Sequence, residues 1–185
     1  NYIPIYGEIM ISRWAYEALA VYQFKNNEYE KHFYSFDREK SISEYKKDYW
    51  LKVLEHKLLN YQHYVNDKTR TEKIETDIIL LRNEIEKEVF NNKEVKPTFD
   101  LEKLNSSVLD SATINLVTLY FENLKDYYNS RYNVAIRLKD ELVNQMQGNP
   151  EAKENFTRLK REYSNDRLSE FVRNSGETSF VKEYN

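Results

Sequence analysis

The chain has no cysteine, and it has only three glycines and three prolines among its 185 residues. The absence of cysteine excludes a disulfide framework and thiolate chemistry. Glycine and proline interrupt helices and build β-turns, so their scarcity argues against a fold with many strands. We therefore predict an all-α protein.

Neither sign of charge dominates, and no long apolar run occurs. The chain carries 28 Lys and Arg against 31 Asp and Glu, a net charge of −3. Proteins that bind nucleic acid concentrate positive charge on one face, and the most basic stretch, 153–173, interleaves its cations with acidic residues. No apolar run approaches the roughly 20 residues that span a bilayer. The sequence therefore predicts no nucleic-acid partner and no membrane span within these residues.

The residues that catalytic sites require do not cluster. Gly7, Gly148 and Gly176 are isolated, so they build neither a phosphate-binding loop nor a nucleophile elbow. His56 and His63 are seven residues apart, which places them about two helical turns apart along one face, too far to share a metal ion. We therefore expect no enzyme activity, metal or cofactor in this chain.

The first third of the chain predicts short helices. Ser12 is a plausible N-cap for a helix that reaches about Phe24 and ends at Asn26-Asn27. A short helix over 28–34 and a turn over 35–37 are expected to follow. The apolar residues predicted to share one face of the first helix are Trp14, Ala18, Val21 and Tyr22.

Three longer segments, 44–66, 70–91 and 110–146, carry apolar residues at helical spacing. Ser41 and Glu44 have the form of a capping box at the start of the first segment. The stripes comprise Tyr45, Trp50, Leu54, Leu58, Tyr61 and Val65; Ile74, Ile78, Leu81, Ile85 and Val89; and Ile114, Val117, Phe121, Leu124, Tyr128, Ala135, Leu138 and Leu142. We predict an antiparallel bundle of these long amphipathic helices.

The remaining segments are connections and short flanking helices. The stretch 93–107 contains proline, serine and asparagine and is the clearest internal connection. Gly148 is expected to stop the long helix, and Pro150 to occupy the first position of the next. Short helices are predicted over 150–163 and 166–174.

The most distinctive segment covers residues 12–19. Its residues are typical of an ordinary amphipathic bundle helix, and they also suit a membrane–water boundary, where arginine and aromatic side chains reach both apolar and polar surroundings. Arg13 and Glu17 have the i,i+4 spacing of a helical ion pair. The residues that carry the motif are Ser12, Arg13, Trp14, Tyr16, Glu17 and Leu19.

This segment, Ser-Arg-Trp-Ala-Tyr-Glu-Ala-Leu, resembles the one that follows the fifth transmembrane helix of G-type ATP-binding-cassette transporters. The family pattern is an arginine, an aromatic residue, one or two further residues, and then Glu-Ala-Leu. The resemblance is greatest to large bacterial members that fuse an ATPase to the permease. Residues 163–172 are similar, more weakly, to the far end of the same loop.

The resemblance implies that the chain is the extracytoplasmic loop between transmembrane helices 5 and 6, on the periplasmic side of the inner membrane. It would cap the substrate exit or contact a periplasmic partner, while ATP and Mg²⁺ are bound elsewhere in the parent protein. The implied partners are the rest of that polypeptide and the membrane surface, with a second transporter copy or a periplasmic protein as further candidates. Both chain ends should then lie close together.

Under this interpretation residues 1–185 form one helical domain with three parts. Residues 1–40 are a membrane-proximal lead-in with the first helices, 41–146 are the long-helix bundle, and 147–185 are C-terminal short helices and a tail.

Two other functions are open at this stage. The chain could be an extracytoplasmic sensor domain of a receptor, which binds a small ligand between its helices. It could also be a soluble scaffold module that oligomerises through a coiled coil, although Tyr and Asn interrupt its apolar stripes.

Overall fold

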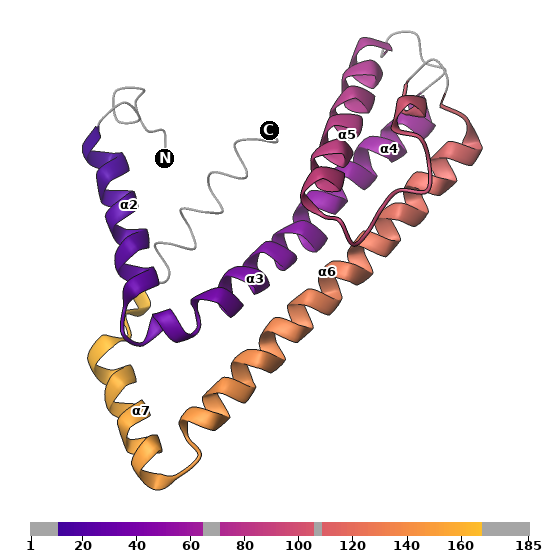
Figure 1. Ribbon diagram of the computed structural model, residues 1–185. Helices are drawn as coiled ribbons and strands as arrows, with labels where there is room; N and C mark the ends of the chain where they lie inside the picture. Colours follow the sequence, from indigo (N-terminus) through magenta and orange to yellow (C-terminus); the bar gives the residue numbers. More distant parts are fainter. Residues whose placement is uncertain (1–10, 65–70, 106–108, 168–185) are drawn as a thin grey trace. The chain divides into compact units, whose positions relative to one another are not determined.

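The computed structural model describes residues 11–64, 71–105 and 109–167, with only the backbone of 11–14, 17 and 71 (Figure 1). These ranges contain helices and connections but no strand, which confirms the predicted all-α class. The elements in chain order are α2 (Ile11–Asn26), the 3₁₀ turn η1 (Glu30–His32), α3 (Tyr34–Tyr45), the π-helical turn η2 (Lys46–Trp50), α4 (Leu51–Tyr64), α5 (Thr71–Asn91), the 3₁₀ turn η4 (Leu101–Lys103), α6 (Ser111–Met146) and α7 (Pro150–Tyr163).

Two of the three long helices lie where the apolar spacing predicted them, whereas the first, expected over 44–66, is part of a helical run from Tyr34 to Tyr64. Helix α5 ends at Asn91 and α6 covers Ser111–Met146, each within one residue of its predicted limits at the ends that are described. Most of the predicted stripe residues on α4, α5 and α6 are buried, although Leu138 near the end of α6 is exposed. The connection after α5 and the proline at the first position of α7 are also confirmed.

Two local predictions between residues 35 and 44 are wrong. The expected turn over 35–37 lies within α3, and Ser41 lies inside that helix instead of capping a new one. Helix α3 begins directly after Phe33, whose backbone carbonyl accepts hydrogen bonds from the amides of Phe36 and Asp37, both at 3.0 Å. Because the Phe33 side chain is buried, this tertiary anchor fixes the helix start more strongly than the local capping pattern does.

The expected helix over 28–34 is only the 3₁₀ turn η1. Helix α2 ends at Asn26, as predicted, and Asn27 organises the turn. Its Oδ1 accepts hydrogen bonds from the backbone N–H groups of Tyr29 (2.8 Å) and Glu30 (3.1 Å). An asparagine side chain that satisfies the next backbone donors favours a tight turn over continued α-helix.

The chain divides into two compact units, and the division falls within α3 and within α6. The first unit contains the described parts of 1–38 and 137–185. The second unit contains the described parts of 39–136.

The second unit holds most of the hydrophobic core. Leu54, Leu81, Val117 and Leu124 are fully buried. The other large apolar residues buried in this unit are Trp50, Leu51, Leu58, Tyr61, Ile74, Ile78, Ile85, Leu104, Leu109, Ile114, Tyr120, Phe121 and Tyr128. Burial of these stripes from α4, α5 and α6 supplies the main stabilisation of the unit.

Helix α4 runs antiparallel to both of its long neighbours, but α5 and α6 run in the same direction. Successive side-chain contacts from the π-helical turn and α4 reach backwards along α5: Lys46 to Glu88, Trp50 to Glu84 and Lys57 to Asp77. Tyr61 contacts Leu109 before α6, and Lys47 contacts Tyr132 further along it. The connection between α5 and α6 therefore returns along the bundle (Figure 1). The Phe99 ring of this connection packs edge-on against Tyr120.

The first unit is smaller and more polar. Phe33 lies in an aromatic cluster with Tyr29 and with Phe156 of α7. The ammonium group of Lys139 lies 5.4 Å from the centre of the Phe33 ring and 2.6 Å from an oxygen of Asp37. These contacts join α7 and the end of α6 to the segment that follows α2.

Several predictions fall outside the described residues. They concern Val65, residues 168–174 of the last predicted helix, and the closeness of the two chain ends. The predicted three-part organisation at residues 40 and 146 stays a prediction.

Candidate functional site

The predicted motif lies in the first half of α2. The described helix already includes Ile11, so Ser12 is inside it and is not its N-cap. The side chains of Arg13 and Glu17 lie outside the described part of the chain, so their ion pair stays a prediction. The side chain of Trp14 also lies outside the described part of the chain.

The described part of α2 exposes apolar side chains on several sides. Tyr16, Leu19 and Tyr22 are 61%, 54% and 66% exposed. These three are spaced three positions apart and so share one broad side of the helix, whereas Val21, 40% exposed, lies about 100° from Tyr22 around the axis. Exposed apolar residues that gather on one element mark an interaction surface more often than scattered ones do.

The predicted inward face of α2 is wrong, because Ala18, Val21 and Tyr22 are exposed and Ala20 is buried instead. The reason is that α2 packs chiefly at its C-terminal end. Its principal contact is with η1, and the Phe24 ring meets Tyr34 edge-on at 6.2 Å. Among the described side chains between residues 15 and 23, all except Ala20 are therefore exposed.

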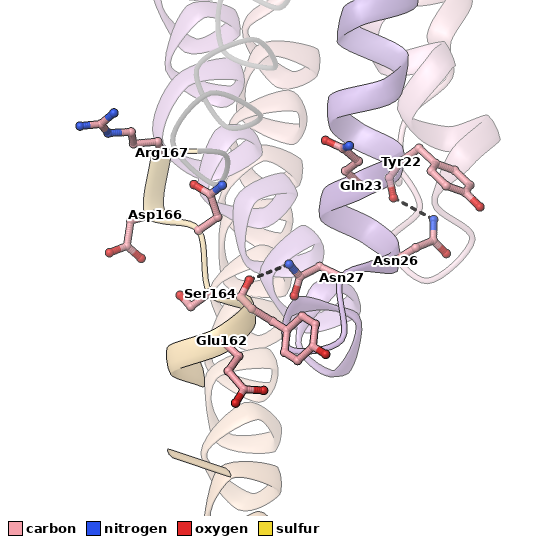
Figure 2. Close-up of a pocket in the computed structure, with 10 residues that line it drawn as sticks. Tyr22, Gln23, Asn26, Asn27, Glu162, Ser164, Asp166 and Arg167 are labelled. Carbon is pink, nitrogen blue, oxygen red and sulfur yellow. Dashed lines mark hydrogen bonds between the residues drawn. The ribbon is translucent and has the colours of Figure 1, made fainter. Parts of the chain in front are cut away.

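A polar depression of about 810 Å³ adjoins this end of α2 (Figure 2). One wall comes from α2 and the residues after it, including Tyr22 and Asn27, and the other from 162–167. The Asn27 side-chain amide donates a hydrogen bond of 2.7 Å to the Tyr163 carbonyl and so ties the walls together. The chain that leaves α7 thus runs beside the end of α2.

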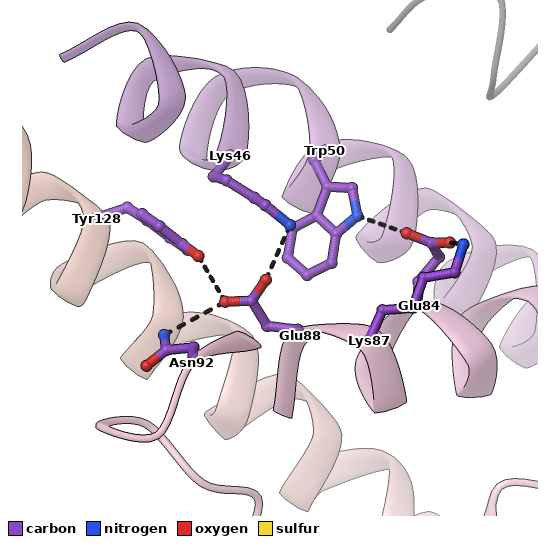
Figure 3. A network of polar contacts seen from close by, with 7 residues as sticks. All are labelled: Lys46, Trp50, Glu84, Lys87, Glu88, Asn92 and Tyr128. Carbon is purple, nitrogen blue, oxygen red and sulfur yellow. Dashed lines mark hydrogen bonds and ion pairs between the residues drawn. The ribbon is translucent and has the colours of Figure 1, made fainter. Parts of the chain in front are cut away.

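A buried polar network lies in the second unit and is the least expected feature of the fold (Figure 3). Its centre is Glu88, which is 2% exposed. One carboxylate oxygen accepts hydrogen bonds from the Tyr128 hydroxyl (2.5 Å) and the Asn92 amide (3.3 Å), and the other pairs with the Lys46 ammonium (2.8 Å). These three donors offset the cost of burying the charge.

Glu84 lies one helical turn before Glu88 and makes the second half of the network. It accepts a 3.0 Å hydrogen bond from the Trp50 indole N–H and pairs with Lys87 at 2.7 Å. The Lys46 ammonium lies 3.7 Å from the centre of the Trp50 ring, which is a cation–π distance. We call Lys46, Trp50, Glu84, Lys87, Glu88, Asn92 and Tyr128 the polar network.

The sequence analysis missed the two glutamates of this network, although a signal was present. Glu84 and Glu88 each follow an apolar stripe residue, Leu81 and Ile85, by three positions. That spacing places both carboxylates on the buried face of α5.

The geometry of the polar network fits a role in stabilising the fold better than a role in catalysis. Both carboxylates are buried and accept hydrogen bonds from donors of the chain itself, whereas a general base must reach a substrate. No cluster of three or more His, Asp or Glu side chains that could hold a metal ion occurs among the described residues. The expected absence of catalysis and of cofactors stays a prediction.

Tyr120 and Tyr128 near Glu88 differ in the hydrogen bonding of their hydroxyl groups. The Tyr128 hydroxyl donates to Glu88, whereas the buried Tyr120 hydroxyl has no hydrogen-bond partner within the described residues. We expect Tyr128→Phe to lower the free energy of unfolding by about 1.5–3 kcal/mol, because it removes a hydrogen bond to a charged group. Tyr120→Phe should leave stability unchanged or raise it by up to about 1 kcal/mol. Urea unfolding of both variants at neutral pH checks this, and equal losses would contradict it.

The same tyrosines predict a loss of stability at alkaline pH. Burial raises the pKa of Tyr128, and the hydrogen bond to Glu88 adds to this; burial and then the Glu88 charge raise the pKa of Tyr120. Above about pH 10 the unfolded chain releases protons that the folded chain retains, so the free energy of unfolding falls as pH rises further. Urea midpoints at pH 8–11 should fall less in the Tyr120→Phe/Tyr128→Phe double variant than in the wild type. The exposed Tyr22→Phe variant is the control and should follow the wild type.

Comparison with known proteins adds no relative: no protein-family model, no curated protein and no solved structure matches the chain. Among the described helices, none combines the length and apolarity needed to cross a bilayer.

Proposed function

We propose that this chain is a non-catalytic extracytoplasmic domain of an ATP-binding-cassette transporter permease, and that α2 holds it against the membrane–water boundary and the rest of its own polypeptide. The observation that carries the proposal is the exposed apolar surface of the helix that bears the motif at residues 12–19. ATP binding and hydrolysis are assigned to another part of the parent protein. The location is the periplasmic side of the inner membrane.

The composition of α2 suits such a boundary. Tyr16 and Tyr22 combine an apolar ring with a polar hydroxyl, and Leu19 between them is aliphatic. Tyrosine and tryptophan are enriched where membrane meets water, because one end of each side chain is apolar and the other is hydrated. Burial of the apolar side chains of such a helix in the membrane–water boundary is favourable and lowers the free energy of the protein.

The path of the chain in the first unit supports the same proposal. The last described residues, 164–167, line the same depression as Tyr22 and Asn27. Helix α2, of 16 residues, is about 24 Å long at 1.5 Å per residue, so its start lies within one helix length of this point. A loop inserted between two neighbouring transmembrane helices needs its ends close together, and the ends themselves, 1–10 and 168–185, lie outside the described residues.

Site-directed fluorescence tests the placement of α2. The chain has no cysteine, so Leu19→Cys provides a single attachment point for an environment-sensitive dye once any cysteine elsewhere in the parent protein is replaced by serine. Leu59→Cys on α4, where the native side chain is 60% exposed, is the matched control. With the parent protein in vesicles of phosphatidylglycerol and phosphatidylcholine, we expect nitroxide-labelled lipids to quench the dye at position 19 and not at position 59.

The alternatives give different results in the same experiment. Quenching of position 19 by aqueous iodide as complete as that of position 59 would contradict contact with the membrane. Protection of position 19 from both iodide and nitroxide lipids would instead favour a protein partner, either a second copy or another part of the transporter.

A further inference from the structure

The helix that runs from Tyr34 to Tyr64 contains a π-helical turn near its middle. This turn, Lys46–Trp50, closes with a hydrogen bond from the Leu51 amide to the Lys46 carbonyl, five residues back. The residues on either side of it, Tyr45 and Leu51, have ordinary right-handed helical backbone angles. The turn is therefore a local widening of a continuous helix, and such turns occur frequently at functional positions.

The parts of this helix before and after the π-turn are held in different ways. After it, α4 buries Leu51, Leu54, Leu58 and Tyr61 in the apolar core. Before it, Ser43 is the one buried residue among those described in α3. Apolar burial is the larger source of stability, so α4 belongs to the most stable part of the second unit.

The residues of α3 and the π-turn that belong to the second unit are held mainly by polar contacts. Glu39 pairs with Arg131 of α6 at 2.5 Å, and the ammonium groups of Lys40 and Lys47 lie 5.7 and 4.2 Å from the centre of the Tyr132 ring. Ion pairs and cation–π contacts that are partly exposed contribute little each. The Lys46–Glu88 pair is the deepest of these contacts, because the carboxylate is buried.

The π-turn separates these two regions at Trp50. Trp50 is fully buried and bonded to Glu84, whereas Lys46 at the start of the turn is bonded to Glu88 (Figure 3). Trp50 is therefore a core anchor, and Lys46 is a latch whose release leaves that anchor in place. An intermediate residue of the turn, Asp48, is exposed, and its ion pair at 3.7 Å is with Lys47 of the same turn.

We propose that residues 39–49 form a separately opening segment of the second unit, with the π-turn as its hinge and the Lys46–Glu88 pair as its latch. Opening breaks the polar contacts of the segment and leaves the apolar core of α4, α5 and α6 intact. The device would allow a local rearrangement without global unfolding, as observed generally for cooperative substructures. The inference does not depend on the proposed transporter function.

Hydrogen exchange resolved by residue tests the proposal on the whole chain. In the wild type the amides of residues 43–49 should exchange at least about tenfold faster than those of residues 54–61, because the former open locally and the latter only with the core. Leu54→Ala should speed exchange in 54–61 by a factor of about 100 and change 43–49 much less, because Leu54 stays buried when 39–49 opens. Glu88→Gln should speed both regions by a factor of about ten, because the Lys46–Glu88 pair is lost in the local opening and in global unfolding alike. Glu86→Gln, a substitution of an exposed glutamate on the same helix, is the control and should change neither region.

Equal exchange of the two regions in the wild type would overturn the proposal, because it would show a single cooperative unit. An equal increase in both regions of the Leu54→Ala variant would also overturn it, because residues 43–49 would then open only together with the core. The wild-type comparison needs no substitution, so the test stands even where either variant folds poorly.

Discussion

Replacing Glu88 with alanine is expected to lower the free energy of unfolding by about 3 kcal/mol, near the lower end of the range for breaking a buried ion pair. The carboxylate accepts from Lys46, Asn92 and Tyr128, and its removal leaves the Tyr128 hydroxyl without an acceptor inside the core. The lower end of the range applies because Lys46 is 23% exposed, and water can partly replace its lost partner. Urea unfolding at pH 7 measures the change.

Glu86→Ala is the matched control for this prediction. Glu86 lies on the exposed side of the same helix and forms a long ion pair with Arg82 at 4.0 Å. Exposed pairs of this kind contribute at most about 1 kcal/mol, and commonly nothing measurable. If Glu86→Ala and Glu88→Ala lowered the free energy of unfolding by similar amounts, the polar network would stabilise the fold no more than an exposed ion pair does.

Replacing Leu54 with alanine should be comparably damaging, with an expected cost of about 3 kcal/mol and a range of roughly 2–5 kcal/mol. Leu54 is completely buried where α4 faces the core, so its truncation removes apolar contacts and leaves a cavity between packed helices. The change is measurable as a lower urea midpoint with an unchanged slope.

Leu59→Ala provides the comparison on the same helix. Leu59 is 60% exposed, so its truncation should change the free energy of unfolding by no more than about 0.5 kcal/mol. A loss at Leu59 as large as that at Leu54 would mean that the exposed side of α4 is covered, and the assignment of the core to α4, α5 and α6 would need revision.

The long helices could be predicted from sequence because their stabilisation follows an apolar period. Ile74, Ile78, Leu81 and Ile85 recur three or four positions apart, and all four are buried. Pro150 likewise occupies the first position of α7, where the missing amide hydrogen costs nothing, with Asn149 as the N-cap. Such signals are local, and nothing elsewhere in the fold opposes them.

Distant contacts explain the local failures. The turn expected around Asp37 is helical, and Asp37 there pairs with Lys139, which lies 102 positions further along the chain. The sequence also did not predict that α5 and α6 run in the same direction, since an antiparallel bundle was expected. The connection over 92–110 is long enough, at up to about 3.3 Å per residue, to return the full length of α5, and sequence spacing alone does not reveal that it does so.

The candidate site was predictable in part. The motif at residues 12–19 does lie on a helix, and its described members Tyr16 and Leu19 are exposed, as a boundary helix requires. The inward face expected for α2 was wrong because helical periodicity assumes a core partner, and α2 packs mainly at one end. The polar network was missed because charged residues on an apolar stripe are normally assigned to its solvent edge.

The central claim is that this chain is an extracytoplasmic domain carried between two membrane-spanning segments. The most direct measurement is to determine the coding sequence on both sides of it. The account predicts an apolar run of roughly 20 residues on each side, together with an upstream G-x-x-x-x-G-K-[ST] nucleotide-binding loop. A reading frame that starts and stops close to Asn1 and Asn185 would contradict it, and the exposed surface of α2 would then require a soluble partner.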